Sequence, residues 1–146
     1  MTAERVETAS ADETEACAGA LAARLRPGDV VLLEGEVGAG KTTFVRGAGR
    51  RLGVAGPVTS PTFTIGQIYD AEVGSPAVSH LDLYRLGSLA DEDPGLLDEY
   101  LGRELVTFVE WPPGGPGEIE AELGEVAARV SIEHLGGDRR RITIER

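Results

Sequence analysis

The segment GEVGAGKTT, residues 35–43, has the spacing of a phosphate-binding loop: Gly35 is followed after four residues by Gly40, Lys41 and Thr42. The glycines of such a loop allow successive backbone N–H groups to turn toward a phosphate, and the lysine adds a compact, mobile charge. Lys41 is the only lysine in the chain, whereas thirteen arginines carry the other basic charges. We therefore expect Lys41 to be an exposed loop charge that contacts phosphate and has no role in the core.

The residues on either side of this loop have the patterns that such a loop requires. The run DVVLLE, 29–34, is short and apolar and predicts a strand that is buried on both faces. Residues 41–52 predict a helix that ends at Gly53, and the N-terminus of that helix favours an anion. The helix contains Gly47 and Gly49, for which we expect close packing against the sheet.

Along the rest of the chain, apolar runs alternate with helical patterns. A capping box at Ser10–Glu13 predicts a helix that extends to about Arg26. We expect strands over 58–70, 77–82 and 105–111, a short helix over 95–103, and a C-terminal hairpin that turns at 136–138. This alternation predicts an α/β sandwich whose mixed sheet has a parallel core and an antiparallel hairpin at its edge.

The length of 146 residues predicts one domain with a single core. No apolar run approaches the roughly 20 residues that cross a bilayer, and the acidic N-terminus lacks the features of a secretion signal. A single cysteine, Cys17, excludes an internal disulfide, and its alanine-rich neighbours predict a small helix residue. We therefore expect a cytoplasmic location and no contact with a membrane.

The net charge of −11 bears on the binding of nucleic acids. Proteins that bind nucleic acids usually present a basic face, because the neutralisation of phosphates supplies much of the affinity. Here the adjacent arginines form only two short clusters, Arg50–Arg51 and Arg139–Arg141, which predict solvated or helix-terminal charges. If a nucleic acid takes part in the function, we expect another protein to hold most of it.

Two acids end apolar strands: Asp82 ends the run AVSHLD and Glu110 ends the run LVTFVE. Taken singly, each could be an edge residue that meets solvent. In open α/β sheets, however, ligands bind beyond the carboxyl ends of the strands, where the phosphate-binding loop also lies. Hydroxyl, carboxylate and phosphate oxygens are the ligands that Mg²⁺ prefers. We therefore predict that both acids join Thr42 in one site.

These motifs occur together in one known family. The segments LLEGEVGAGKTTFVRG, SPTFT, HLDLYRL and FVEWP have the order and spacing found in the TsaE family, formerly called YjeE. The resemblance extends from the N-terminal helix to about Pro112, with a looser match in the last hairpin. The family is the bacterial ATPase of the tRNA threonylcarbamoyladenosine pathway. The resemblance implies a P-loop NTPase-like three-layer sandwich and a single P-loop ATPase domain, 1–146.

The resemblance also implies roles for individual residues. Thr42 and Glu110 would bind Mg²⁺, and Asp82 would orient the attacking water. Lys41, Asp82 and Glu110 are thus the expected catalytic residues, and Trp111 would stack or pack beside the site. The expected ATP contacts are Gly35, Gly38, Ala39, Gly40, Lys41, Thr42, Thr43 and, in the last hairpin, Arg139. Ser60, Pro61, Thr62 and Thr64 would form a switch segment near the γ-phosphate.

From the residues alone, several of these features have simpler interpretations. Pro61 would set a turn, with Thr62 and Thr64 as ordinary strand residues, and Trp111 would anchor the end of a strand. We expect His80 to be packed or hydrogen-bonded rather than a metal ligand, since no second histidine or cysteine lies at metal spacing.

What the resemblance implies about function is specific. The family hydrolyses ATP slowly on its own and works with two proteins, TsaB and TsaD, which transfer a threonylcarbamoyl group to adenosine 37 of certain tRNAs. We therefore expect ATP and Mg²⁺ as ligands, homologues of TsaB and TsaD as partners, and contact with tRNA only through their complex. The segment LADEDPGLLDEYL, 89–101, is a looser form of the family's acidic helix, and this departure bears on the partner contacts.

Three other nucleotide-binding functions are alternatives to an ATPase: a GTPase, a small P-loop kinase and a nucleotide sensor. The chain contains no asparagine, which excludes the guanine-binding Asn-Lys-x-Asp element of a GTPase. A small P-loop kinase needs an acceptor pocket and usually a lid, and little chain remains after the core strands to build them. That kinase and a nucleotide sensor without hydrolysis stay as alternatives. Phosphate release without an acceptor would argue against the kinase, and its absence under all conditions would favour the sensor.

Overall fold

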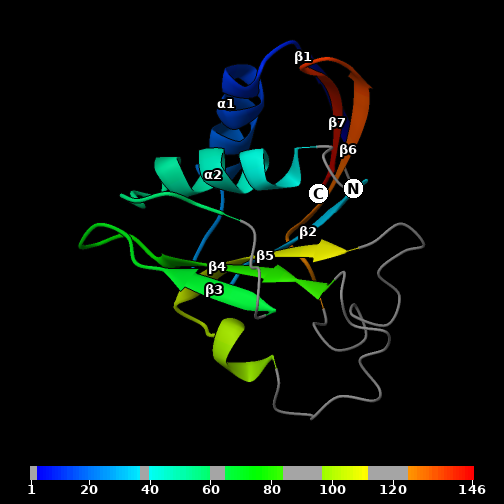
Figure 1. Cartoon of the computed structure of the whole chain (residues 1–146). Helices are drawn as coiled ribbons and strands as arrows, with labels where there is room; N and C mark the ends of the chain where they lie inside the picture. Colours follow the sequence, from blue (N-terminus) through cyan, green and yellow to red (C-terminus); the bar gives the residue numbers. More distant parts are fainter. Residues whose placement is uncertain (1–2, 37–39, 60–64, 84–96, 112–124) are drawn as a thin grey trace.

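The computed structural model describes residues 3–36, 40–59, 65–83, 97–111 and 125–146 (Figure 1). In these ranges seven strands form one sheet in the order β1-β7-β6-β2-β5-β4-β3. The strands are β1 (Ala3–Thr8), β2 (Val30–Gly35), β3 (Gly66–Tyr69), β4 (Ala77–Asp82), β5 (Leu105–Trp111), β6 (Ala128–Gly136) and β7 (Arg139–Glu145). The helices are α1 (Ala11–Ala22), α2 (Lys41–Arg51) and the 3₁₀ helix η3 (Asp98–Tyr100).

The sheet has a parallel core with antiparallel strands on both sides. Strand β2 pairs in parallel with β5 and β6, and β5 pairs in parallel with β4. Strands β6 and β7 form the predicted antiparallel hairpin, and β3 runs antiparallel to β4 at the other edge. The predicted mixed sheet is therefore confirmed.

Most predicted strands lie where the sequence patterns put them. The runs 77–82 and 105–111 form strands with those bounds. The strand predicted over 29–34 begins and ends one residue later, at Val30 and Gly35. Of the predicted strand 58–70, only Gly66–Tyr69 is a strand in the described residues, which omit 60–64. Within the predicted helix 95–103, the described part contains the single turn η3.

One strand, β1, was missed by the sequence analysis. It pairs antiparallel with β7, so that Ala3 lies opposite Glu145. Its sequence, AERVET, contains three charged residues and a single branched apolar side chain, Val6. This strand lies at the edge of the sheet, where mostly polar residues are tolerated because one side of the backbone faces solvent. The sequence of β1 therefore lacks the apolar pattern that would predict a strand.

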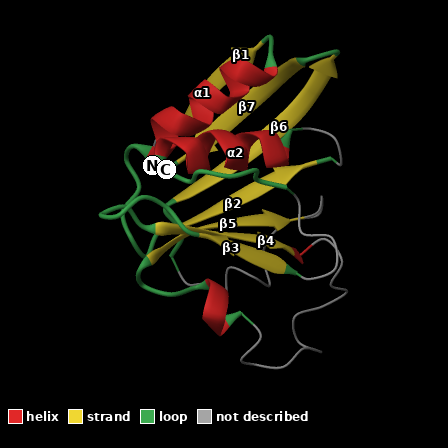
Figure 2. Ribbon diagram, turned by 60° about the vertical axis from the view of Figure 1, so that its left-hand side comes forward, coloured by secondary structure: helices red, strands yellow, loops and turns green. Residues whose placement is uncertain are grey.

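Both α-helices cover the same face of the sheet, as Figure 2 shows. The first begins at a capping box: the Ser10 side chain accepts a hydrogen bond from the Glu13 backbone N–H at 3.2 Å, and the Glu13 carboxylate accepts one from the Ala9 N–H at 3.0 Å. It ends at Ala22, short of the predicted Arg26. No helix in the described ranges has the length and apolar character needed to span a membrane.

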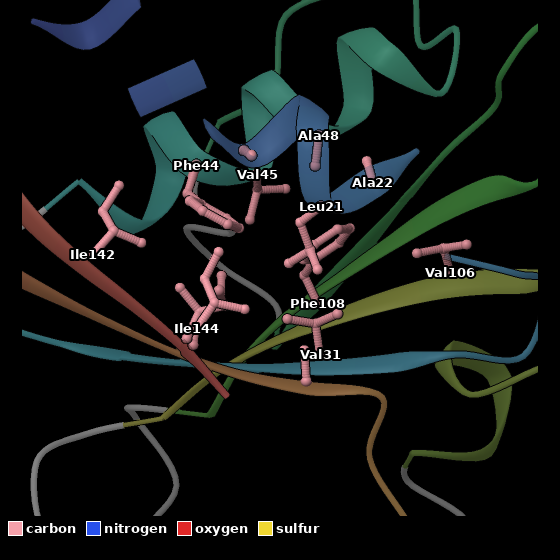
Figure 3. Packing of buried hydrophobic residues seen from close by; sticks show 14 of the residues in the cluster. Leu21, Ala22, Val31, Phe44, Val45, Ala48, Val106, Phe108, Ile142 and Ile144 are labelled. Carbon is pink, nitrogen blue, oxygen red and sulfur yellow. The ribbon is translucent and has the colours of Figure 1, made fainter. Parts of the chain in front are cut away.

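The main core fills the space between these two helices and the sheet (Figure 3). Phe44 and Val45 of α2 and Phe108 of β5 are fully buried there. Burial of each such side chain contributes about 1.5–3 kcal/mol. A smaller cluster lies on the opposite face, where the described residues include η3 as the only helical element. Its members are Leu32, Leu81, Leu83, Leu97 and Val109.

Cys17 lies on α1, half-buried against the main core, as expected for a small helix residue. Burial raises the pKa of its thiol, and the negative charge of Glu4 raises it further. A thiol with a raised pKa stays protonated at neutral pH and is a poor nucleophile. The structure thus favours a packing role for Cys17.

Gly47 allows the two helices to touch. A Cβ atom on Gly47 would overlap the backbone of Glu15 on α1. Backbone atoms cannot move aside as a flexible side chain can, so the helices would have to separate. The expectation that both helix glycines pack against the sheet is wrong for Gly47, whose close neighbour is the other helix. A Cβ on Gly49 would make ordinary contacts of 3.6 Å with Val54.

We predict that Gly47→Ala lowers the free energy of unfolding by about 1–3 kcal/mol, because the added methyl forces α1 away from α2. The control is Gly49→Ala in the same helix, which should be neutral or raise the stability by up to about 1 kcal/mol, since alanine favours a helix more than glycine does. Urea unfolding followed by circular dichroism measures both. Equal stabilities for the two variants would contradict the close helix contact.

Candidate phosphate and cation site

The predicted phosphate-binding loop joins β2 to α2. Strand β2 ends at Gly35, and Gly40 is the N-cap of α2 with a φ angle of 110°. That left-handed conformation is strained for a residue with a side chain, so position 40 favours glycine. A Cβ atom there would also lie 3.5 Å from the Arg140 Nε atom. Gly38 and Ala39 lie outside the described residues.

Lys41 is buried, with 8% of its surface exposed, which corrects the expectation of an exposed charge. Its Nζ atom donates a hydrogen bond to the Gly35 carbonyl oxygen at 2.8 Å. This bond joins the first turn of α2 to the end of β2, across the loop. Burial of the stem leaves the ammonium held near the loop backbone, so less conformational entropy is lost when it binds an anion.

The first turn of α2 suits an anion. Its N-cap, Gly40, has no side chain that could accept hydrogen bonds from the first helical N–H groups, and the turn contains no acidic residue. A helix N-terminus carries about half a positive charge. Lys41 adds a full charge, and Thr42 and Thr43 add hydroxyl groups, both partly exposed. These residues fit a phosphate group.

The two predicted acids lie side by side at the same edge of the sheet. Asp82 and Glu110 are direct partners in the parallel pairing of β4 and β5. On its other side, Glu110 is the partner of Leu33 on β2, two residues before Gly35. Glu110 is 3% exposed, whereas Asp82 is partly exposed. The structure therefore brings both acids to the end of the strand that enters the loop.

His80 lies beneath Glu110 and is completely buried. Its Nε2 atom is 3.4 Å from the Glu110 Oε2 atom, yet neither ring nitrogen makes a hydrogen bond within the described residues. A buried polar atom without a partner costs about 1–3 kcal/mol. The sequence analysis predicted a packed or hydrogen-bonded histidine but did not connect it with Glu110.

The last hairpin places an arginine beside the loop, and this residue is Arg140. Arg140, Ile142 and Ile144 are two residues apart along β7, so their side chains lie on the same face of the sheet. Both isoleucines belong to the main core, and this is the face that α2 covers. The predicted contact, Arg139, begins β7 and is exposed. The alternation in RRITI could have identified Arg140, because the two isoleucines mark the buried face.

The predicted switch residues Ser60, Pro61, Thr62 and Thr64 lie outside the described residues, as does the side chain of Trp111. The described residues on both sides of 60–64 are anchored. The Tyr69 hydroxyl donates to the Thr59 carbonyl oxygen at 3.0 Å, and the Ile65 carbonyl oxygen accepts from the Asp82 N–H at 2.6 Å. Thr59, before the segment, thus contacts Tyr69, and Ile65, after it, contacts one of the two acids.

The donor atoms at this edge fit Mg²⁺. A threonine hydroxyl and carboxylates are hard oxygen ligands, which Mg²⁺ takes together with phosphate oxygens. Glu110 is a carboxylate buried without a described lysine or arginine beside it, so an added cation would compensate its charge. The structure therefore supports a site that combines a phosphate cradle with a cation position.

Comparison with known proteins finds similar chains in one family. A family model described as "Threonylcarbamoyl adenosine biosynthesis protein TsaE" matches residues 8–142. Three relatives named tRNA threonylcarbamoyladenosine biosynthesis protein TsaE are similar over most of the chain. The Streptomyces coelicolor protein is 47% identical over 119 residues, which cover 81% of this chain and 77% of that protein. The Bacillus subtilis protein is 42% identical over 136 residues, which cover 93% of this chain and 81% of that protein. The Treponema pallidum protein is 36% identical over 141 residues, which cover 96% of this chain and 98% of that protein.

A solved structure is similar to the whole chain. The crystal structure of Bacillus subtilis YdiB superposes with a TM-score of 0.73 at 37% sequence identity. The match covers 98% of this chain and 84% of that protein. The likeness therefore includes the sheet, both α-helices and the strand ends that carry the acids.

We predict that Arg140→Ala weakens the binding of an adenine nucleotide by about 10–100-fold, as expected for loss of a hydrogen bond to a charged group. The matched control is Arg139→Ala, which removes the same side chain one residue away, on the exposed side of β7. A surface charge contributes about 0–1 kcal/mol, so this control should lose at most about fivefold. Calorimetric titration measures both, and a larger loss in the Arg139 variant would favour the contact implied by the resemblance.

Proposed function

Because the chain belongs to the TsaE family, we propose that it binds and hydrolyses ATP with Mg²⁺ in the biosynthesis of threonylcarbamoyladenosine on tRNA. One observation carries the ATPase part of this proposal. The loop that holds Lys41 and the carboxylates of Asp82 and Glu110 meet at one edge of the sheet, through adjacent parallel strands. Phosphate-binding groups and metal-binding acids at one edge are the parts that phosphoryl transfer requires.

In this proposal, the loop and α2 bind the phosphates. The backbone N–H groups at the start of α2 donate to phosphate oxygens, and the helix dipole favours their negative charge. The Lys41 ammonium leaves the Gly35 carbonyl for the β- and γ-phosphates, a short movement because its stem is already packed. Arg140, beside Gly40, adds a second cation at the loop. Charges held in advance in this way stabilise the transition state more than water does.

Thr42 and Glu110 would hold Mg²⁺ in this proposal, and bound Mg²⁺ would neutralise charge on the phosphate oxygens. Asp82 accepts a hydrogen bond from the attacking water and orients it. Its position one strand beyond Glu110 and its partly exposed side chain suit this role. In this proposal Glu110 contributes to the binding of Mg²⁺ and ATP in the ground state, and Asp82 positions the water that attacks.

We further propose that ATP turnover serves a partner complex of the TsaB and TsaD type. The chain has a net charge of −11, which disfavours tight binding of tRNA by this protein alone. The segment 60–64 would transmit the state of the nucleotide, since Ile65, the residue that follows it, is hydrogen-bonded to Asp82. Ordering of such a segment by a γ-phosphate and Mg²⁺ is a common device of NTPases.

The two acids should differ in their effects on ATP binding and hydrolysis. We predict that Glu110→Ala weakens Mg²⁺-dependent binding of ATP, whereas Asp82→Asn mainly slows hydrolysis, because a metal ligand acts in the ground state and a water-orienting group acts in the transition state. Titration of Mg²⁺ against a fluorescent ATP analogue, with phosphate release measured in parallel, separates the two effects. The same Mg²⁺ dependence in both variants would exclude this division of roles.

The proposed partnership predicts reciprocal coupling. If ATP tightens docking to a TsaB–TsaD complex, that complex must raise the ATP affinity of this chain by the same factor. The experiment measures ATP affinity and phosphate release with and without the saturating complex, and tRNA binding by the isolated chain. The proposal predicts raised ATP affinity and weak tRNA binding. Unchanged ATP affinity together with strong, salt-sensitive tRNA binding would overturn it.

A further inference from the structure

Among the described residues, His80 is a fully buried titratable side chain that the proposed mechanism does not use. We propose that it is a positioning residue: its Nε2–H group holds the Glu110 carboxylate in the orientation that binds the cation. This inference rests on the proposed function, because it assigns a role to a residue beneath the proposed Mg²⁺ ligand. It concerns the geometry of Glu110 and requires no change in the charge of His80.

The first support is the isolation of the pair. His80 is completely buried, and Glu110 is the one carboxylate in contact with it among the described residues, at 3.4 Å between Nε2 and Oε2. The neighbours of His80 across the sheet are Phe108 on β5 and Gln67 on β3, and within the described ranges neither ring nitrogen has a hydrogen-bond partner. The Glu110 carboxylate is therefore the acceptor toward which the Nε2–H group of His80 is placed, at 3.4 Å.

The second support is the direction of the strands. His80 and Asp82 are two residues apart on β4, so both side chains lie on the face that carries Glu110. His80 approaches Glu110 from deeper in the sheet, while Asp82 lies beside it at the edge. An imidazole fixed on all sides by packing gives the carboxylate a rigid support on its buried side.

The observed distance is longer than a good hydrogen bond, and it has a simple interpretation. Contacts within sites are often long in the free protein and tighten when the ligand binds. If one Glu110 oxygen binds the cation, a donor on the other oxygen keeps the carboxylate from rotating away. Loss of such supporting contacts typically costs about 10–100-fold in metal affinity.

The first test requires no change at His80. The chain has two histidines, His80 and His134, so ¹⁵N-labelled protein gives two imidazole spin systems, and a His134→Gln variant assigns them. We expect the His80 proton on Nε2 in the protein without nucleotide, and a changed Nε2 shift in Glu110→Gln. A proton on Nδ1 alone, with Nε2 bare, would overturn the proposal.

The second test measures the ratio of ATP affinities with and without Mg²⁺. We expect His80→Phe, which fills the space but cannot donate, to lower this ratio by about 10–100-fold. His80→Gln, whose amide can donate from a similar position, should restore most of the ratio. The matched control is Ser79→Ala, at an equally buried neighbour that faces the other side of β4, and it should leave the ratio unchanged.

Failure of this inference is distinct from failure of the proposed function. If the parent protein shows no effect of Mg²⁺ on ATP binding, the proposed function fails. If the parent shows the effect and folded His80→Phe retains all of it, the positioning role fails and His80 serves packing alone. Thermal unfolding checks that each variant is folded, and if His80→Phe is not, the Nε2 assignment and His80→Gln decide.

Discussion

The candidate site depends on the parallel pairing of β5 between β2 and β4. This register puts Glu110 opposite Leu33 on one side and opposite Asp82 on the other. Glu110 therefore lies next to the end of the strand that enters the loop, and Asp82 lies one strand farther away. A slip of one residue would turn every side chain of β5 to the other face of the sheet. Glu110 would then leave the face that carries His80, and Phe108 would leave the main core.

The packing of α2 is the second requirement, because this helix carries Lys41 at its first residue. Phe44 and Val45, one turn into the helix, are fully buried against the sheet, and Gly47 lets α1 approach closely. The core therefore fixes the N-terminus of α2 relative to β2. The same packing buries the Lys41 stem and leaves its amino group on the Gly35 carbonyl.

Much of this arrangement could be predicted from the sequence, because local patterns encode it. The loop motif between an apolar run and a helix, and the acids at the ends of two strands, fixed the edge of the sheet where the site lies. Two of the predictions that failed depended on contacts between distant segments. The burial of Lys41 and the contact of Gly47 with Glu15 arise from tertiary packing, which no local pattern contains.

Two relevant residues carried weaker sequence signals. The position of Arg140 follows from the alternation of Ile142 and Ile144, whereas the family resemblance implied a contact by Arg139. The contact of His80 with Glu110 required the relative register of β4 and β5, which the sequence does not state. Both residues lie on the face of the sheet that the helices cover, where the loop and the acids meet.

The central claim is that Lys41 serves phosphate chemistry and is not needed for the fold. The most direct measurement compares the parent protein with Lys41→Ala in the rate of phosphate release from ATP in the presence of Mg²⁺. Urea unfolding measures the stability of both. The account predicts that the variant is folded, with a free energy of unfolding lowered by about 1–2 kcal/mol through loss of the hydrogen bond to Gly35. Its hydrolysis rate should fall by about 10²–10³, the usual cost of removing one preorganised charge. Hydrolysis by a folded Lys41→Ala at the rate of the parent would contradict the account.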